Sequence, residues 1–177
     1  MEELRVVFAG FGGQGLLFAG KVVANAGLID GREVSWLPSY GPEMRGGTAN
    51  CSVTLSDEPI GSPLIMSPNV LVAMNQPSLV KFEEAVVPGA KVFADTSLVN
   101  RLPQREDIEV FAHPATELAE DAGLKGLANI VLVGKVLKET ALCSRETMEA
   151  AIRKAVPARK AQMVENNLQA LELGFNL

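Results

Sequence analysis

The sequence of 177 residues has few of the residues that build common catalytic and metal sites. It contains one histidine, His113, and two cysteines, Cys51 and Cys143, which lie far apart and form no C-x-x-C pair. Two cysteines alone cannot hold an iron–sulfur cluster or a tetrahedral zinc ion. No serine stands in a nucleophile elbow. The sequence therefore predicts no catalytic residue and no metal ligand, and it predicts buried thiols in place of a disulfide.

Clustered positive charge and long apolar runs are missing as well. The formal net charge is −5 and no contiguous Lys/Arg cluster is present, which argues against nucleic-acid binding. No segment reaches the roughly 18 uninterrupted apolar residues that a membrane span needs. Glu2 and Glu3 do not fit the start of a signal peptide. We therefore expect a cytoplasmic protein with neither a nucleic-acid partner nor a membrane partner.

Hydrophobic residues make up 47% of the chain and aromatic residues only 5%, so an aliphatic core is expected. The segment 48–55 follows the strand 33–37 without room for a crossover helix, which predicts antiparallel pairing or a lateral excursion. Alternating strands and helices favour a three-layer α/β/α fold with a mostly parallel, mixed sheet and a helical C-terminal third, formed by one domain over 1–177. Strands are predicted at 4–8, 33–37, 48–55, 69–74, 91–94 and 108–112, and helices at 16–27, from 75 onward, 116–122, 128–141, 145–155 and 158–173.

Single residues set several boundaries of these elements. Pro38 is expected to end the second strand and to open an irregular loop. Asn75 and Ser144 are expected to cap the helices that follow them, and Asn129 the next helix after it. In the helix that begins near Asn75, the predicted buried side includes Leu79, Val80, Phe82, Val86 and Val87.

The most informative segment is Gly10-Phe11-Gly12-Gly13-Gln14-Gly15, which joins the first strand to the first helix. Gly10, Gly12 and Gly15 fit the G-x-G-x-x-G spacing of a Rossmann-like β-turn-α unit. Glycine permits a positive φ, expected here at Gly12, and lets the backbone approach a ligand closely. The first N–H groups of the helix favour a phosphate. Gly10, Gly12, Gly13, Gln14 and Gly15 are therefore candidate cofactor contacts.

The remainder of the dinucleotide fingerprint is missing. A carboxylate should end the second strand and bind a ribose, but the sequence there is Ser35-Trp36-Leu37-Pro38. This argues against NAD or FAD. Three interpretations of the four glycines stay open. They can form a packed turn without a ligand, a phosphate site or a contact with a partner's backbone.

A second glycine-rich segment, Ser39 to Gly47, contains the only tyrosine of the chain. Arg45 can grip a phosphate or a carboxylate in bidentate fashion, or it can pair with Glu43. Tyr40 and Arg45 are also residue types enriched at interface hot spots. Tyr40, Arg45, Gly46 and Gly47 complete the set of candidate contacts, while Asp95 and His113 are expected to have capping or packing roles.

These segments carry a family resemblance. Gly10 to Gly15, then Y-G-P-E-M-R-G-G from Tyr40, N-C-S-V from Asn50 and S-D-E-P-I-G-S-P from Ser56 resemble the gamma subunit of 2-oxoacid:ferredoxin oxidoreductases, of the 2-oxoglutarate or branched-chain (2-oxoisovalerate) type. The small subunit of indolepyruvate:ferredoxin oxidoreductase has a similar domain, but its second motif is closer to H-G-M-x-Q-R-G-G. Tyr40 and Glu43 depart from that pattern and favour the gamma type.

The resemblance implies one subunit of a larger enzyme, inactive alone. Such enzymes oxidatively decarboxylate a 2-oxoacid, join the acyl group to coenzyme A and pass electrons to ferredoxin. Thiamine diphosphate is held by the alpha and beta subunits, and iron–sulfur clusters by beta or a small delta subunit. The glycine-rich segments would contact coenzyme A, the partner subunits or both. A stand-alone nucleotide- or coenzyme-A-binding module and a non-catalytic scaffold are the alternatives.

Overall fold

The computed structural model describes residues 3–39 and 48–177. Four of the candidate contacts, Tyr40, Arg45, Gly46 and Gly47, lie outside the described residues, so the predictions made for them stay predictions. The remaining candidates, Gly10 to Gly15, lie within the described part of the chain and join its first strand to its first helix.

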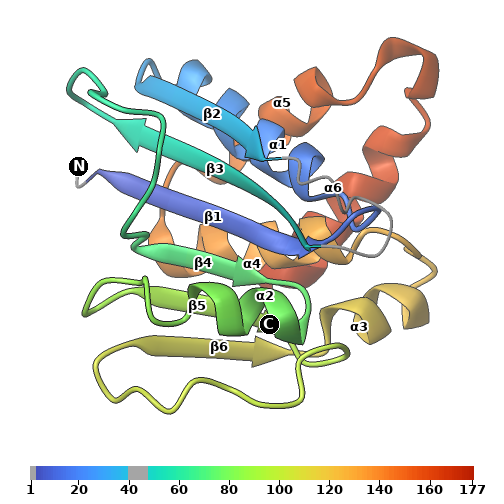
Figure 1. The fold of residues 1–177 in the computed structure, drawn as a ribbon. Helices are drawn as coiled ribbons and strands as arrows, with labels where there is room; N and C mark the ends of the chain where they lie inside the picture. The colour runs from blue at the N-terminus through green and yellow to red at the C-terminus, as the bar shows by residue number, and fades with distance from the viewer. Residues whose placement is uncertain (1–2, 40–47) are drawn as a thin grey trace.

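A six-stranded mixed sheet forms the centre of the molecule, in the order β2-β3-β1-β4-β5-β6 (Figure 1). β1, β4, β5 and β6 are parallel neighbours, whereas β3 runs antiparallel to both β1 and β2. The predicted antiparallel pairing of the third strand is thus confirmed. The strands are β1 (Leu4–Phe11), β2 (Glu33–Ser39), β3 (Thr48–Ser56), β4 (Val70–Ala73), β5 (Lys91–Asp95) and β6 (Glu109–His113).

Helices cover the two faces of the sheet unequally. Helices α1, α4, α5 and α6 lie behind the sheet in Figure 1, whereas α2 alone crosses its front. The predicted α/β fold with a mixed sheet and a helical C-terminal third is confirmed. The helices are α1 (Leu16–Ile29), α2 (Gln76–Phe82), α3 (Ala115–Asp121), α4 (Ala128–Thr140), α5 (Arg145–Ala155) and α6 (Met163–Phe175), with a 3-10 turn at Ala158–Lys160 between α5 and α6.

The alternation of side chains along β1 divides the core in two. Val6 and Phe8 enter the larger cluster, under the four helices, whereas Val7 and Ala9 enter the smaller cluster with Leu79 of α2. Successive strand residues point to opposite faces, so a strand covered on both sides is apolar at every position. The core is mainly aliphatic, as the composition predicts, with Phe8 and Phe93 as its fully buried aromatic side chains.

Several predicted boundaries are wrong in instructive ways. β2 continues through Pro38 to Ser39, because β2 lies at an edge of the sheet, where a missing N–H group costs no ladder bond. Helix α2 ends at Phe82, so Val86 is buried outside it, and Val80 is half exposed. The predicted helix 158–173 is a 3-10 turn followed by α6.

Among the described residues, no helix is long and apolar enough to cross a membrane.

Candidate functional site

The glycine turn lies where the parallel strands end. After β1 the chain passes into α1 on the back of the sheet, over β3 and β2, whereas after β4 it passes into α2 on the front (Figure 1). The crevice outside the carboxyl ends of β1 and β4 is therefore a topological switch point. Ligands of open α/β sheets bind at such crevices. The glycine turn is therefore the first candidate for a ligand-binding site.

The conformation of the turn corrects one expectation. Gly13 has a φ of 93° and Gly15 a φ of 74°, whereas Gly12 is not among the residues with positive φ. The prediction for Gly12 is therefore wrong. Gly15 is the N-cap of α1, and in this left-handed conformation a side chain is strained. Gly13 and Gly15 are thus the two positions of the turn where the positive φ favours glycine.

The side chain of Gln14 bridges the ends of β1 and β4 at the switch point. Its Oε1 atom accepts a hydrogen bond from the Phe11 N–H group at 2.6 Å, and its Nε2 group donates to the Met74 carbonyl oxygen at 3.0 Å. A Cβ atom at Gly10 would collide with Gln14 Oε1, so glycine at this position leaves space for the Gln14 side chain. Gln14 therefore joins the ends of β1 and β4 through both atoms of its amide group.

Three clefts meet at Gly13 on the outer side of the turn. The first lies beside Phe11, Leu16 and Ala49 and has a volume of about 380 Å³. The second lies toward Thr116 and Lys125, with about 210 Å³. The largest, of about 490 Å³, lies between the turn and the starts of α4 and α6, within the size range of small-molecule sites. We call this largest one the α4–α6 cleft; among its lining residues are Gly13, Gly15, Asn129, Lys160 and Asn167.

Two buried asparagines line the α4–α6 cleft. Asn129 is 3% exposed and Asn167 is 1% exposed. Asn129 Nδ2 donates to the Gly15 carbonyl oxygen at 2.9 Å, and Asn167 Nδ2 donates to the Met163 carbonyl oxygen at 2.7 Å. Neither Oδ1 atom has a hydrogen-bond partner among the described residues. Buried polar atoms are rarely left unpaired, so these two acceptors need an explanation.

Asn129 also corrects a prediction. Helix α4 begins at Ala128 with Leu127 as its N-cap, so Asn129 does not cap it. Its side chain reaches 114 residues back along the sequence to the glycine turn. A contact between the first turn of α4 and the start of α1, so far apart in the sequence, cannot be derived from local sequence patterns.

The α1 and α4 helices both begin without a side-chain cap. Neither has an acidic residue in its first turn. By contrast, Asn75 caps α2 and Ser144 caps α5, as predicted, each accepting a hydrogen bond from a backbone N–H group. The free N–H groups of a helix start carry partial positive charge. Together with Lys160, they make the α4–α6 cleft favourable for an anion.

The other polar candidates have structural roles. Asp95 is fully buried at the end of β5, where its carboxylate accepts bonds from the N–H of Ser97 and from the N–H and Oγ1 of Thr116. It therefore fixes the first turn of α3 to the sheet.

Burial, together with the positive charge of Lys135, lowers the pKa of His113. Among the described residues no cluster of three or more His, Cys, Asp or Glu side chains can hold a metal ion.

Both cysteines are free; Cys51 is buried, as predicted, whereas Cys143 is only partly buried. Burial raises the pKa of the Cys51 thiol to about 11 and that of the Cys143 thiol to about 12. Because the thiolate is the reactive form, neither cysteine is suited to nucleophilic chemistry.

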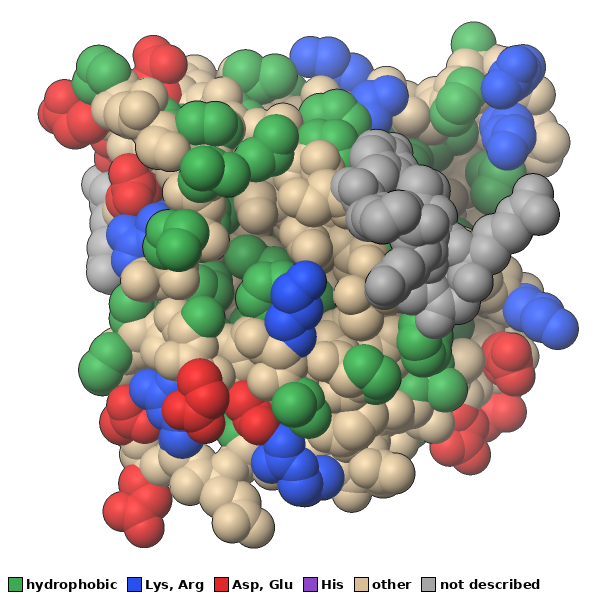
Figure 2. All heavy atoms as spheres, in the orientation of Figure 1, with side chains coloured by type: hydrophobic (Ala, Val, Ile, Leu, Met, Phe, Trp, Pro, Cys, Tyr) green, Lys and Arg blue, Asp and Glu red, His purple; other side chains and the backbone are tan. Residues whose placement is uncertain are grey.

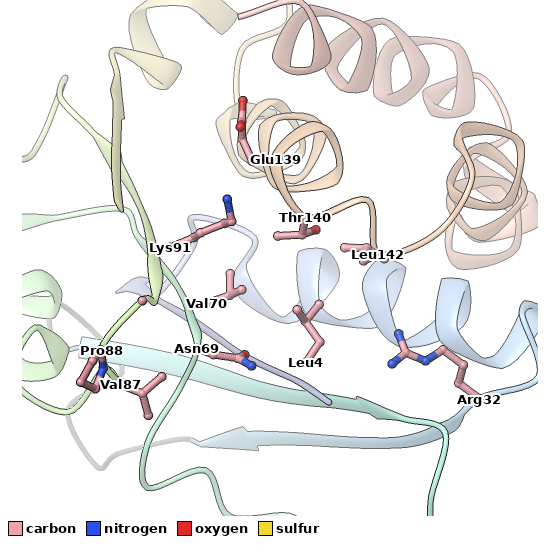
Figure 3. Close-up of a pocket in the computed structure, with 11 residues that line it drawn as sticks. Leu4, Arg32, Asn69, Val70, Val87, Pro88, Lys91, Glu139, Thr140 and Leu142 are labelled. Atoms are coloured by element: carbon pink, nitrogen blue, oxygen red, sulfur yellow. The ribbon is translucent and has the colours of Figure 1, made fainter. Parts of the chain in front are cut away.

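A further cavity, of about 220 Å³, lies at the opposite end of the sheet, near the amino ends of β1, β4 and β5 (Figure 3). There Asn69 Oδ1 accepts from the Arg5 N–H group at 2.7 Å, and Asn69 Nδ2 donates to the Glu3 carbonyl oxygen at 2.8 Å. Lys91 pairs with Glu109, and Glu139 pairs with Lys135. These polar groups stabilise one another, which is typical of a structural cavity.

The fold and the turn together define an α/β domain whose first β-turn-α unit is Rossmann-like. The family described as pyruvate ferredoxin/flavodoxin oxidoreductase matches residues 5–177. The chain therefore belongs to this family, and its resemblance to the gamma subunits of 2-oxoacid:ferredoxin oxidoreductases is confirmed.

Three relatives illustrate the match. Ketoisovalerate oxidoreductase subunit VorA from Methanothermobacter marburgensis is 41% identical over 98% of this chain, which spans only 36% of that protein. The 2-oxoglutarate synthase subunit KorC from Methanocaldococcus jannaschii is 36% identical over 99% of this chain and 93% of the relative. The crystal structure of a keto/oxoacid ferredoxin oxidoreductase gamma subunit from Geobacter sulfurreducens PCA superposes with a TM-score of 0.84 at 31% identity, covering 98% of this chain and 96% of that one.

Proposed function

We propose that this chain is the gamma subunit of a 2-oxoacid:ferredoxin oxidoreductase whose substrate is 2-oxoglutarate. The observation that carries this proposal is the match to 2-oxoglutarate synthase subunit KorC, which extends over 93% of that subunit. The match to VorA has slightly higher identity but covers about a third of the VorA chain. A relative of the same length and arrangement is the better guide to how this chain is used.

In the proposed reaction, 2-oxoglutarate is oxidatively decarboxylated, its acyl group is joined to coenzyme A and the electrons pass to ferredoxin. Thiamine diphosphate belongs to the alpha and beta subunits and the iron–sulfur clusters to beta or delta. This chain contributes the glycine turn and the segment Tyr40 to Gly47 as contacts for coenzyme A or for the partner subunits. The complex works in the cytoplasm, where free thiols such as Cys51 and Cys143 persist.

An affinity tag on this chain tests the proposal. Purification from the source cells is expected to bring down alpha and beta chains that bind thiamine diphosphate. The purified complex is expected to oxidise 2-oxoglutarate in a coenzyme-A-dependent reaction, with a larger kcat/KM than for 2-oxoisovalerate. Recovery of the chain alone, or preference for 2-oxoisovalerate, would contradict the subunit assignment or the substrate, respectively.

A second candidate is a stand-alone module that binds coenzyme A or a nucleotide. The α4–α6 cleft favours it, since its volume of about 490 Å³ lies within the range of small-molecule sites. The same purification separates the two candidates. A stand-alone module would be recovered as a monomer that binds coenzyme A, ATP or NAD in calorimetry, and a subunit would be recovered with its partners.

A further inference from the structure

We infer that the face of the molecule at the carboxyl ends of the parallel strands docks a partner subunit, and that two opposite charge clusters beside the glycine turn set the orientation of that partner. The partner presents acidic side chains to the connection between α5 and α6, and basic side chains to helix α3. The inference rests on the proposed function and assigns a contact surface to it.

The connection between α5 and α6 gathers positive charge in a chain whose formal net charge is −5. No acidic residue occurs between Glu149 and Glu165, whereas four basic residues do. All four are exposed, and none forms an ion pair with another described residue. Figure 2 shows Lys and Arg side chains at the upper right, where this connection lies in Figure 1. We call these residues the basic cluster: Arg153, Lys154, Arg159 and Lys160.

Helix α3 gathers negative charge on the other side of the glycine turn. We call its three acidic residues the acidic cluster: Glu117, Glu120 and Asp121. They are exposed, and they too form no ion pair among the described residues. Figure 2 shows Asp and Glu side chains at the lower right, beside α3. Lys125, in the loop that follows, offsets only one of the three negative charges.

The glycine turn lies between the two clusters. Gly13 and Lys160 both line the α4–α6 cleft, and Gly13 and Glu120 both line the cleft of about 210 Å³. Each cleft also has one exposed large apolar side chain, Met163 in the first, 37% exposed, and Leu98 in the second, 43% exposed. Protein interfaces combine an apolar centre with a polar rim. The glycine turn and its two apolar neighbours form such a centre, and the charge clusters form the rim.

Opposite charges on two sides of one surface specify how a partner sits on it. Charge complementarity contributes more to orientation and specificity than to affinity, so one orientation is favoured and its reverse is repelled. A relative supports a partner of different sequence: this chain spans only 36% of VorA, so in VorA the matching part is joined to a longer stretch of other sequence. We assign the docking surface to a separate subunit that takes the place of that stretch. A second copy of this chain is the alternative that the test includes.

The test is a competition for the partner subunits. A tagged beta subunit is co-expressed with alpha, with the wild-type chain and with one variant of it, and the ratio of variant to wild type in the purified complex measures their relative affinity. Lys160→Glu and Glu120→Lys are each expected to lower this ratio about fivefold, because an attractive charge at the rim becomes repulsive. Urea unfolding of each variant is expected to match wild type, since both residues are exposed.

Matched controls carry the same charge changes elsewhere. Lys81→Glu and Glu84→Lys replace exposed residues on and just after α2 that line none of the clefts at the glycine turn, and both are expected to compete equally with wild type. The double variant Lys160→Glu with Glu120→Lys keeps the net charge of the wild-type chain. Local complementarity predicts that its two losses add, to about 25-fold. A return to the wild-type ratio would show an effect of net charge alone and overturn the docking surface.

The failures of the two proposals differ. An active complex in which Lys160→Glu and Glu120→Lys compete as well as the controls would overturn the docking surface and leave the proposed function standing. Recovery of the tagged beta subunit without this chain would overturn the proposed function and this inference with it. Sedimentation of the full chain alone tests the second copy. A homodimer that each single variant weakens, and that a mixture of the two variants restores, would assign the surface to self-association and overturn the partner subunit.

Discussion

The two ends of the sheet each have a cavity lined by asparagine, and the asparagines are used differently. At the amino ends of the strands, Asn69 has both amide atoms bonded, to Arg5 and Glu3. At the carboxyl ends, Asn129 and Asn167 each use only the Nδ2 group. The first arrangement is complete without a ligand. The second arrangement leaves the buried Oδ1 atom of each asparagine unpaired among the described residues.

The difference follows from the direction of the chain. In a parallel α/β unit, the helix after a strand begins at the carboxyl end of the sheet, so helix N-termini gather there. α1 and α4 bring uncapped N–H groups to the glycine turn, while the cavity of Figure 3 lies beside Thr140, the last residue of α4. Of the two cavities, as far as the described residues show, the one beside the glycine turn combines unpaired asparagine oxygens with two uncapped helix starts.

The largest expected effect is that of a side chain at Gly15. Gly15→Ala forces a left-handed residue and pushes a Cβ atom into the Asn129 amide, so we expect a loss of about 3 kcal/mol of unfolding free energy. Gly13→Ala also has a positive φ but open space around it, and about 1 kcal/mol is expected. Urea unfolding of both variants measures the comparison. Equal losses would show that the Gly15–Asn129 contact does not determine the turn.

Exchanging asparagine for leucine at the two ends should destabilise the fold by different amounts. Asn69→Leu leaves the Arg5 N–H group without its acceptor, so a loss of about 2 kcal/mol in unfolding free energy is expected, with no change in KM for coenzyme A. Asn167→Leu removes an unpaired oxygen together with one hydrogen bond, and less than about 1 kcal/mol is expected. Thermal unfolding and steady-state kinetics on the same samples test this. A more destabilising change at Asn167 would reverse the comparison.

The smallest effect concerns pH. The pKa of His113 is lowered from 6.5, by burial first and then by Lys135, so the folded state binds fewer protons than the unfolded state just below that value. Stability therefore rises with pH through the window that ends near 6.5 and is lost as the pH falls. His113→Gln is expected to flatten the slope of unfolding free energy against pH between 5 and 7. A slope identical to wild type would assign the dependence to other groups.

Much of the fold could be predicted because its signals are local. The aliphatic run of β4, the capping residues Asn75 and Ser144 and the glycine turn each follow from neighbouring residues, and the structure confirms them. Pro38 could not be placed correctly, because whether proline breaks a strand depends on the strand's position in the sheet. That position is set by pairing with β3, outside the local sequence.

The site was predicted only in part. The glycines mark the turn, but Gln14 binds the backbone of Phe11 and of Met74, a role that its spacing does not reveal. Asn129 and Asn167 reach the cleft through helices far along the chain, and their isolated positions carry no motif. The one local signal is the position of Asn129 next to the start of a helix, and this signal favours a helix cap.

Pro38 has a consequence for self-association. β2 forms one edge of the sheet among the described residues, and an exposed edge is a template on which a second chain can add a strand. Proline offers no donor there, so the hydrogen-bond ladder of an incoming strand would be interrupted one residue before the end of β2. Pro38 therefore shortens the part of β2 on which a second chain could add a strand.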